Sequence, residues 1–362
     1  MITSVQVNNV RNISQVLVKP SPIVNIFYGD NGSGKSSFLE ALFLLSTGRS
    51  FRTSELKNLI KFDESSLLVR SEISKKENTS SIGFSFTKAG IRVAKRDGEK
   101  LKNSSELAKS IPLKFLSPLV SELVEGSPSV RRKYVDWLMF HVEHGYINRI
   151  KHFKTVLANR NAVLKNKDRE QEPYWTSQFI SLSEELANLC SRTCEALAPY
   201  IQQALTEFLV GVEVEVNYYQ GWNVTKSLEE LLEKNKEIEF KFGSTRYGFQ
   251  RSDLRLTVKG RPINLVLSRG QMKLCSLALQ LAQVRFIKEL NGLKCTVLID
   301  DVIAELDDAN VCRVVDGFID SESQCFITSA NDKLPEILSS TIGKNYKLFH
   351  VEHGTITEEE YP

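Results

Sequence analysis

Short apolar runs alternate with polar residues along the first hundred residues, and this pattern predicts strands joined by turns. Residues 1–28 give short strands, and the apolar run Ile23–Tyr28 has the length of a buried strand that stops at Gly29. Segment 35–45, KSSFLEALFLL, is mostly apolar, which predicts a buried helix. The further elements expected here are strands at 65–73, 80–87 and 91–95, with Asp97-Gly98 as a hairpin turn.

The pattern changes to a helical period near Pro112. Apolar residues recur at helical spacing through 147–164 and again through 182–208, with the charged linker 165–173 between them. We therefore expect an antiparallel helical hairpin or small bundle over 120–210. Strands are expected at 212–218 and 253–258, the second ending in a turn at Lys259-Gly260.

After Leu265 the chain returns to alternating helices and strands. The pattern predicts a helix at 271–289, a strand at 295–299, a helix at 308–319 and a strand at 324–328. The fold class is therefore α/β, interrupted by a largely helical insertion. The expected divisions are 1–112 and 251–362 for the two parts of the α/β lobe, and 113–250 for the insertion.

Composition describes an ordinary globular chain of 362 residues. It is 41% hydrophobic and 25% charged, with a net charge of +3, so its overall charge does not by itself require a nucleic-acid partner. The six cysteines include no Cys-x-x-Cys pair, which favours reduced thiols over a metal site. No signal-peptide pattern and no apolar stretch of 18 residues occurs, so we expect a cytoplasmic protein without a membrane partner.

A phosphate-binding loop follows the strand that ends at Tyr28. Its residues fit the pattern G-x-x-x-x-G-K-[ST], between an apolar strand and an apolar helix, as Gly29, Asp30, Asn31, Gly32, Ser33, Gly34, Lys35 and Ser36. The glycines let backbone N–H groups point at phosphates, and the helix N-terminus adds partial positive charge. Lys35 is expected on the β- and γ-phosphates of ATP, and Ser36 on Mg²⁺.

A second nucleotide motif is the apolar strand Thr296–Ile299, which ends in Asp300 and Asp301. This is the Walker B pattern when it accompanies a P-loop. We expect Asp300 to hold Mg²⁺ through water, as a hard oxygen ligand, and Asp301 to orient the attacking water as a general base. The P-loop and the Walker B strand lie far apart in sequence, but they must meet in space because the phosphates and their Mg²⁺ need both.

The segment Ser268, Arg269, Gly270 and Gln271 opens the helix before the Walker B strand. Taken alone, Ser268 is best explained as a helix N-cap. Its place upstream of Walker B, with one helix between, resembles the signature motif of ABC ATPases. In that family the Ser hydroxyl and the helix N-terminus bind the γ-phosphate of ATP held by the other subunit.

Two later segments extend the resemblance to ABC ATPases. Glu305-Leu306-Asp307 resembles the D-loop of that family, so Asp307 is a D-loop candidate. The family's switch residue, usually His, corresponds to Thr328 or Ser329 here. The resemblance implies a mixed sheet with flanking helices and a homodimer that forms when ATP binds.

The order of the motifs is specific to one branch of these ATPases. The sequence resembles the RecF family of bacterial recombination mediators, in the SMC/Rad50-like branch. The matching stretches span nearly the whole chain in the family's order: NNVRN (8–12), GDNGSGKSS (29–37), TGRSFRT (47–53), EGSPSVRRKYVD (125–136), NRNAVL (159–164), RSDL (251–254), LSRGQMK (267–273) and LIDDVIAELD (298–307).

The resemblance implies an ATP-driven DNA clamp in recombinational repair. It implies binding to duplex DNA or a single-strand/duplex junction, weak DNA-stimulated ATP hydrolysis, and action with RecO and RecR to load the RecA recombinase. It also adds Arg11, Asn12 and Ser37 to the ATP-binding residues. From the residues themselves, the DNA candidates are Arg131, Arg132 and Lys133, with further cations on the insertion at Arg149, Lys151, Lys154, Arg160, Lys165 and Lys167.

Three other functions fit parts of the pattern. A soluble ABC-transporter subunit is disfavoured by Arg269, where transport subunits favour Gly, and by the helical insertion. The head of a long SMC or Rad50 arm is disfavoured because the insertion is far too short for such a coiled coil. A nucleotide switch that binds ATP without hydrolysing it remains open, and phosphate release with and without DNA discriminates it.

Overall fold

The protein divides into two compact units, which are described separately. The computed structural model describes residues 1–75, 78–301, 306–330, 333–338 and 346–359. The first unit comprises residues 1–120 with 287–362, and the second comprises 121–286. The sequence predicts divisions after residues 112 and 250. The structure divides after residue 120 and after residue 286, so β10, β11 and most of α8 belong to the second unit.

An antiparallel sheet forms one layer of the first unit. Alternate residues are buried along much of β4 and β5, and less regularly in β1, which is the pattern of a sheet with one face on the core. The turn at Asp97-Gly98 is a hairpin with both residues at positive φ, as the sequence predicts. The strand order is β2 (Ile13–Val18), β1 (Ile2–Val10), β4 (Ser66–Lys75), β5 (Asn78–Thr87), β6 (Arg92–Arg96) and β7 (Glu99–Lys100).

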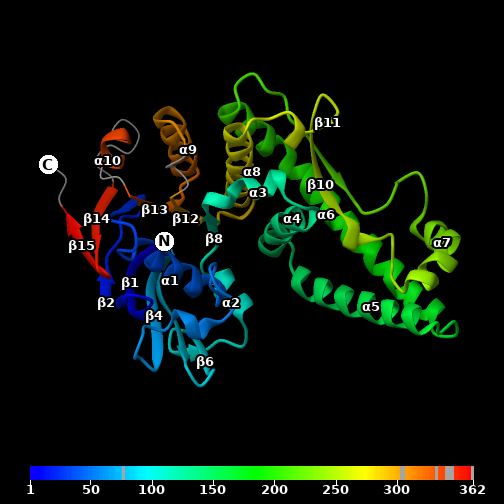
Figure 1. The fold of residues 1–362 in the computed structure, drawn as a ribbon, viewed down its shortest axis with the longest axis horizontal. Coiled ribbons are helices and arrows are strands. Elements are labelled where there is room, and N and C mark those ends of the chain that lie inside the picture. Colours follow the sequence, from blue (N-terminus) through cyan, green and yellow to red (C-terminus); the bar gives the residue numbers. More distant parts are fainter. Residues whose placement is uncertain (76–77, 302–305, 331–332, 339–345, 360–362) are drawn as a thin grey trace. The chain divides into compact units, whose positions relative to one another are not determined.

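A mainly parallel sheet forms the second layer of this unit (Figure 1). Its two central strands are buried along almost their whole length, because a parallel sheet is covered on both faces. The carboxyl ends of its parallel strands share one edge, which brings motifs distant in sequence together. The order is β15 (Thr355–Glu359), β14 (Tyr346–Glu352), β3 (Val24–Tyr28), β13 (Gln324–Ser329), β12 (Thr296–Asp300) and β8 (Leu113–Leu116), with β15 antiparallel.

Helix α1 (Lys35–Thr47) packs against strands of both sheets. Phe27 of β3 lies at the centre of this core, with ring centroids 4.7 Å from Phe38 of α1 and 4.8 Å from Phe349 of β14. These contacts fix the end of β3 and the start of α1, and so the loop between them. The remaining helical elements of the unit are η1 (Leu56–Leu59), α2 (Ser104–Ser110), α9 (Asp308–Asp320) and α10 (Leu334–Ile337).

The second unit is largely helical, as expected for the insertion. Helices α5 and α6 pack as the predicted antiparallel pair, and α7 packs on α5 (Figure 1). Strands β9 and β10 pair within this unit, which is why its boundary falls beyond residue 250. η2 (Pro118–Ser121) spans the boundary at residue 120. The elements of the second unit are α3 (Glu122–Glu125), α4 (Pro128–Val142), α5 (Tyr146–Asn166), α6 (Glu172–Phe208), β9 (Glu215–Tyr219), α7 (Leu228–Phe242), η3 (Phe249–Arg251), β10 (Asp253–Val258), β11 (Arg261–Pro262), η4 (Ile263–Leu265) and α8 (Arg269–Asn291), which continues beyond the unit's boundary.

A buried ion pair holds the helices of the second unit together. Arg160 is 1% exposed and its Nη2 lies 2.7 Å from Glu239 Oε2. Thr176 and Thr245 accept hydrogen bonds from the same guanidinium. Arg160 is therefore not the surface cation that the sequence predicts, because its charge is compensated inside the unit.

Candidate functional site

The loop between β3 and α1 has the backbone of a phosphate cradle. Gly29, Gly32 and Gly34 have φ of 144°, 82° and 126°, which side-chain-bearing residues rarely adopt. A Cβ on Gly29 would lie 2.2 Å from the carbonyl oxygen of Val351. Gly34 is the N-cap of α1, so the helix N-terminus opens directly onto the loop. Glycine is required here by geometry, as the motif predicts.

Lys35 is folded back over this loop. Its side chain is 4% exposed, and Nζ donates to the carbonyl oxygens of Gly29, at 2.6 Å, and Asp30, at 2.9 Å. The ammonium group is therefore held inside the cradle by two carbonyl oxygens, and neither hydrogen bond pairs it with an anion. The buried hydroxyl of Ser33 has no hydrogen-bond partner among the described residues. Both groups are suited to an anion such as a phosphate.

Two hairpins hold the far side of the loop. Asn12, in the β1–β2 turn, donates from Nδ2 to the carbonyl oxygens of Ser33, at 2.9 Å, and Gly32, at 3.2 Å. The backbone N–H of Gly354, in the β14–β15 turn, donates to the same Ser33 oxygen at 2.7 Å. These bonds occupy the carbonyl oxygens of Gly32 and Ser33 and fix the loop from outside. Sequence reasoning missed Gly354 altogether, although a Gly after an alternating run is a turn signal.

Arg11 is predicted to bind ATP and lies beside the same turn. Its guanidinium makes two bonds to the Glu40 carboxylate, of 2.9 and 3.1 Å, and donates to the Asn58 carbonyl oxygen at 2.9 Å. Glu40 is fully buried and also accepts from the Ser50 hydroxyl. This network anchors the β1–β2 turn on α1. A contact of Arg11 with ATP stays a prediction.

The Walker B carboxylates lie at the end of β12, beside the end of β13. Asp300 is 7% exposed, and its Oδ1 accepts a 2.8 Å hydrogen bond from the hydroxyl of Thr328 on β13. The backbone N–H of Asp301 donates to that hydroxyl oxygen at 3.1 Å. Thr328, predicted as a switch candidate, thus connects both carboxylate residues. Ser329, the other candidate, follows it at the end of the same strand.

Asp301 has the features of a functional carboxylate. Its φ is 50°, an uncommon conformation for Asp, and its Oδ1 is buried without a hydrogen-bond partner among the described residues. Burial and the neighbouring charge of Asp300 raise the pKa of Asp301, while the positive charges of Lys35 and Arg52 oppose the rise. A carboxylate with a raised pKa and an oxygen without a hydrogen-bond partner is suited to accept a proton.

The oxygen donors at this edge fit a magnesium ion. Asp300 supplies a buried carboxylate, and Ser36, half-buried at the first turn of α1, supplies a hydroxyl. Mg²⁺ is usually held by one or two such groups, with water and phosphate completing the shell. Among the described residues, no group of three His, Cys, Asp or Glu side chains forms a separate metal site. The predicted donor set is thus brought to one edge of the sheet.

The predicted signature residues lie in the second unit. Ser268 and Gln271 form a capping box at the start of α8: Gln271 N donates to Ser268 Oγ at 3.3 Å, and Ser268 N donates to Gln271 Oε1 at 2.9 Å. Arg269 and Gly270 are exposed, and a Cβ on Gly270 would meet open space. The helix start is therefore capped and accessible, and contact with a nucleotide stays a prediction.

Asp307, the predicted D-loop residue, is the N-cap of α9. Its Oδ1 accepts from the backbone N–H of Asn310 at 2.8 Å, and this bond lowers the pKa of Asp307. Residues 302–305 of the same motif, with Glu305, lie outside the described residues.

The three DNA candidates lie on α4, in different surroundings. Arg131 binds Asp253 through two hydrogen bonds of 2.8 and 3.0 Å, and both side chains are 13% exposed. Arg132 donates to the Ser252 carbonyl oxygen at 2.8 Å, and Lys133 is exposed. Arg131 therefore tethers α4 to β10. Among the three, Lys133 is the one fully placed on the surface.

The mixed sheet, the P-loop, the Walker B strand and the insertion define an ABC-type P-loop ATPase. Comparison with known proteins agrees: residues 1–357 match the model of the RecF/RecN/SMC N-terminal domain. Proteins named DNA replication and repair protein RecF are 36% identical in Pseudoalteromonas atlantica, over 99% of each chain, and 33% identical in Cellvibrio japonicus, over 98% of this chain and 99% of that one. The chain belongs to the RecF family.

Solved structures give the same assignment. A structure of the recombination mediator protein RecF with ATP, in the RecFOR pathway, superposes with a TM-score of 0.85 at 27% identity, covering 99% of this chain and 97% of that one. An Smc head bound to the C-terminal winged-helix domain of ScpA superposes with a TM-score of 0.62 at 17% identity, covering 99% and 96%, and shares the fold. In the described part of the chain, no helix is long and apolar enough to cross a membrane.

Proposed function

We propose that the protein binds Mg-ATP at the P-loop and hydrolyses it weakly, with stimulation by DNA. The observation that carries this proposal is the position of Asp301, whose buried, unpartnered Oδ1 lies within electrostatic reach of Lys35. A structural carboxylate would be expected to have hydrogen-bond partners. The unpartnered Asp301 oxygen beside Lys35 therefore supports a role in the reaction. ATP is also the ligand of the related RecF structure.

Each group at the edge of the sheet has a distinct part in this reaction. Lys35 exchanges its carbonyl partners for the β- and γ-phosphates, which carry more negative charge. Ser36 and Asp300 would hold Mg²⁺, which neutralises charge on the phosphate oxygens. Asp301 orients the attacking water and accepts its proton, and Thr328 fixes the direction of both aspartates.

The active form in this proposal is a homodimer that closes when ATP binds. The P-loop of one subunit and the exposed Ser268 helix start of the other would enclose each nucleotide. Closure would form a clamp on duplex DNA or on a single-strand/duplex junction, and hydrolysis would release it. Relatives named as DNA replication and repair proteins, and a RecF structure assigned to the RecFOR pathway, support action with RecO and RecR in loading RecA, in the cytoplasm where chromosomal DNA lies.

The proposal is tested by phosphate release and sedimentation velocity with ATP, ADP or no nucleotide, each with and without duplex DNA. We expect a dimer only with ATP, and slow phosphate release that DNA accelerates. Lys35→Ala should lower ATP affinity by at least about tenfold, because it removes a charge-assisted contact. ATP-dependent dimers that release no phosphate would identify a nucleotide switch. Wild-type ATP affinity in Lys35→Ala would overturn the P-loop assignment.

A further inference from the structure

A single buried carboxylate connects two segments of the first unit that border the P-loop. Glu40 lies on α1 and is fully buried. Its carboxylate accepts two hydrogen bonds from the Arg11 guanidinium, on the β1–β2 turn, and one from the hydroxyl of Ser50, on the loop that follows α1. Burial of a carboxylate is unfavourable unless the group is paired and hydrogen-bonded, and Glu40 obtains its partners from both segments.

The first segment, the β1–β2 turn, supports the P-loop. Asn12, the neighbour of Arg11, donates from Nδ2 to the carbonyl oxygens of Gly32 and Ser33. Arg11 has a φ of 56°, which is uncommon for a residue with a side chain, so the turn needs external partners to keep this shape. The ion pair between Arg11 and Glu40 therefore sets where the turn meets the P-loop.

The second segment is the loop after α1, which carries Arg52. The Ser50 hydroxyl donates to Glu40 and accepts from the backbone N–H groups of Arg52, at 2.9 Å, and Thr53, at 3.0 Å. This hydroxyl thus makes all three hydrogen bonds available to it, and they fix the backbone that carries Arg52. The charge of Arg52 acts on Asp301, so this loop reaches the Walker B end of the site.

We propose that Glu40 is a positioning residue, which sets the β1–β2 turn and the loop of Arg52 relative to each other around the P-loop. Through Arg11 and Asn12 it acts on the affinity for ATP. Through Ser50 and Arg52 it acts on the rate of hydrolysis. The second effect rests on the proposed function, whereas the first requires only that ATP binds. A carboxylate with a purely structural role would change the stability of the unit without acting through these two paths.

A double-mutant cycle in ATP affinity tests the first path. Glu40→Gln keeps the size of the side chain but removes the charge that Arg11 pairs with, and it should raise the Kd for ATP about tenfold in equilibrium dialysis. Asn12→Ala removes the bonds between the turn and the P-loop. In that background Glu40→Gln should raise the Kd by less than about twofold, because its effect passes through Asn12. Glu40→Asp, which keeps the charge and withdraws it by one methylene group, replaces Glu40→Gln if that variant does not fold.

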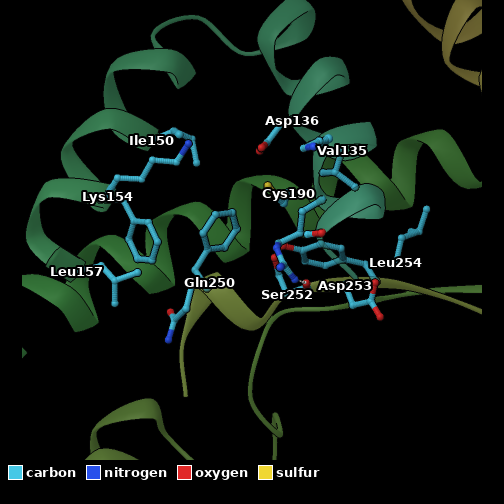
Figure 2. Close-up of a pocket in the computed structure, with 16 residues that line it drawn as sticks. Val135, Asp136, Ile150, Lys154, Leu157, Cys190, Gln250, Ser252, Asp253 and Leu254 are labelled. Carbon is cyan, nitrogen blue, oxygen red and sulfur yellow. Dashed lines mark hydrogen bonds between the residues drawn. The ribbon is translucent and has the colours of Figure 1, made fainter. Parts of the chain in front are cut away.

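Asp253→Asn is the matched control for the loss of a buried ion pair. Asp253 also accepts two hydrogen bonds from one arginine, Arg131, at 2.8 and 3.0 Å. It lies in the second unit, where it lines a cavity to which no residue of the ATP motifs contributes (Figure 2). The control should lower the melting temperature and leave the Kd for ATP unchanged. Equal changes in Kd from Glu40→Gln and Asp253→Asn, or effects of Glu40→Gln and Asn12→Ala that simply multiply, would overturn the role of Glu40.

Steady-state kinetics test the second path. Ser50→Ala should lower kcat about threefold with the Kd for ATP near its wild-type value, because it releases the loop of Arg52 and leaves the Arg11 ion pair in place. Ser50→Thr keeps the hydroxyl and should restore kcat. Ser54→Ala, at an exposed serine of the same loop, should match wild type. A Ser50→Ala protein with wild-type kcat would overturn the coupling to this loop.

The two readouts also separate this proposal from the proposed function. If the wild-type protein releases no phosphate, the proposed hydrolysis is wrong, and the cycle in ATP affinity still decides whether Glu40 positions the turn. If phosphate release is as proposed but the effects of Glu40→Gln and Asn12→Ala multiply, the positioning role of Glu40 is wrong and the proposed function stands.

Discussion

The hydroxyl of Thr328 donates a 2.8 Å hydrogen bond to Asp300 Oδ1, and the same oxygen accepts a 3.1 Å bond from the backbone N–H of Asp301. Thr328 is fully buried, on the strand between the Walker B strand and the P-loop strand. One hydroxyl therefore holds the carboxylate of Asp300 and the backbone of Asp301. The assignment of Thr328 as the counterpart of the ABC switch residue stays a prediction.

Thr328→Val should slow ATP hydrolysis with little change in KM for ATP. Valine fills the same space but leaves Asp300 and the Asp301 N–H without their shared partner, a cost of about 1–3 kcal/mol. Thr328→Ser, which keeps the hydroxyl, is the matched control and should retain most of kcat. Steady-state kinetics with the melting temperature of each variant provide the check. A Thr328→Val enzyme with wild-type kcat would remove the positioning role.

Hydrolysis should fall at acidic pH as Asp301 becomes protonated. Its raised pKa places that loss above the pH at which an ordinary Asp titrates. Arg52 opposes the rise, so Arg52→Gln should move the acidic limb of kcat to higher pH. Because the folded-state pKa is raised, Asp301 favours the folded state below that pKa and loses this contribution as pH rises. Asp301→Asn should keep ATP binding, slow hydrolysis and remove the limb.

The control for the pH profile is Arg49→Gln. Arg49 is exposed on the same loop region but does not act on the pKa of Asp301. Its profile should coincide with the wild-type profile. If the acidic limb of kcat in Arg49→Gln shifted as far as in Arg52→Gln, the effect would come from the overall charge and not from the local contact of Arg52 with Asp301.

Gly354→Ala should weaken ATP binding through the P-loop it supports. Gly354 has φ of 80°, and a Cβ would lie 2.3 Å from the Asn12 carbonyl oxygen, so the turn must move away from Ser33. Gly98→Ala is the control, since Gly98 has φ of 86° in another hairpin of the same unit with nothing within 4 Å of an added Cβ. Both variants should lose some stability, but only Gly354→Ala should raise the Kd for ATP in equilibrium dialysis.

Arg131→Ala should lower the melting temperature and leave the salt dependence of DNA binding nearly unchanged. The substitution removes the ion pair with Asp253 and leaves that largely buried carboxylate without its partner. Lys133→Ala should leave the melting temperature unchanged and flatten the salt dependence of DNA binding. A lost phosphate contact reduces the slope of log affinity on log salt by roughly one. A flattened slope in Arg131→Ala with an unchanged melting temperature would assign Arg131 to DNA after all.

Much of the ATPase unit could be predicted because its elements have strong local patterns. The strand before Gly29, the helix after it and the strand ending in Asp300 each carry a uniform apolar run bounded by motif residues. The hairpin β14–β15 was missed because residues 346–352 do not alternate regularly: Leu348 and Phe349 are adjacent and both buried. The hairpin pairs with β3 and holds Ser33 of the loop. Such a contact over more than 300 residues has no local signature.

Charges were the least predictable part of the chain. Arg160, Arg131 and Lys133 carry the same kind of charge in similar helical contexts, yet the first is buried on Glu239, the second is tethered to Asp253, and the third is exposed. Their environments depend on partners 79 and 122 residues away in the first two cases. The helical period predicts which face a residue occupies but not which acid the fold brings to that face.

The central claim is that two subunits close on ATP, with Ser268 of one against the nucleotide of the other, and Ser268→Arg tests it most directly. The substitution costs about 1 kcal/mol as a lost N-cap, so Ser227→Arg, at the cap of α7, is the matched control. In sedimentation velocity with ATP, wild type and Ser227→Arg should form dimers, while Ser268→Arg should bind ATP and stay monomeric. A Ser268→Arg protein that dimerises on ATP like wild type would contradict the proposed interface.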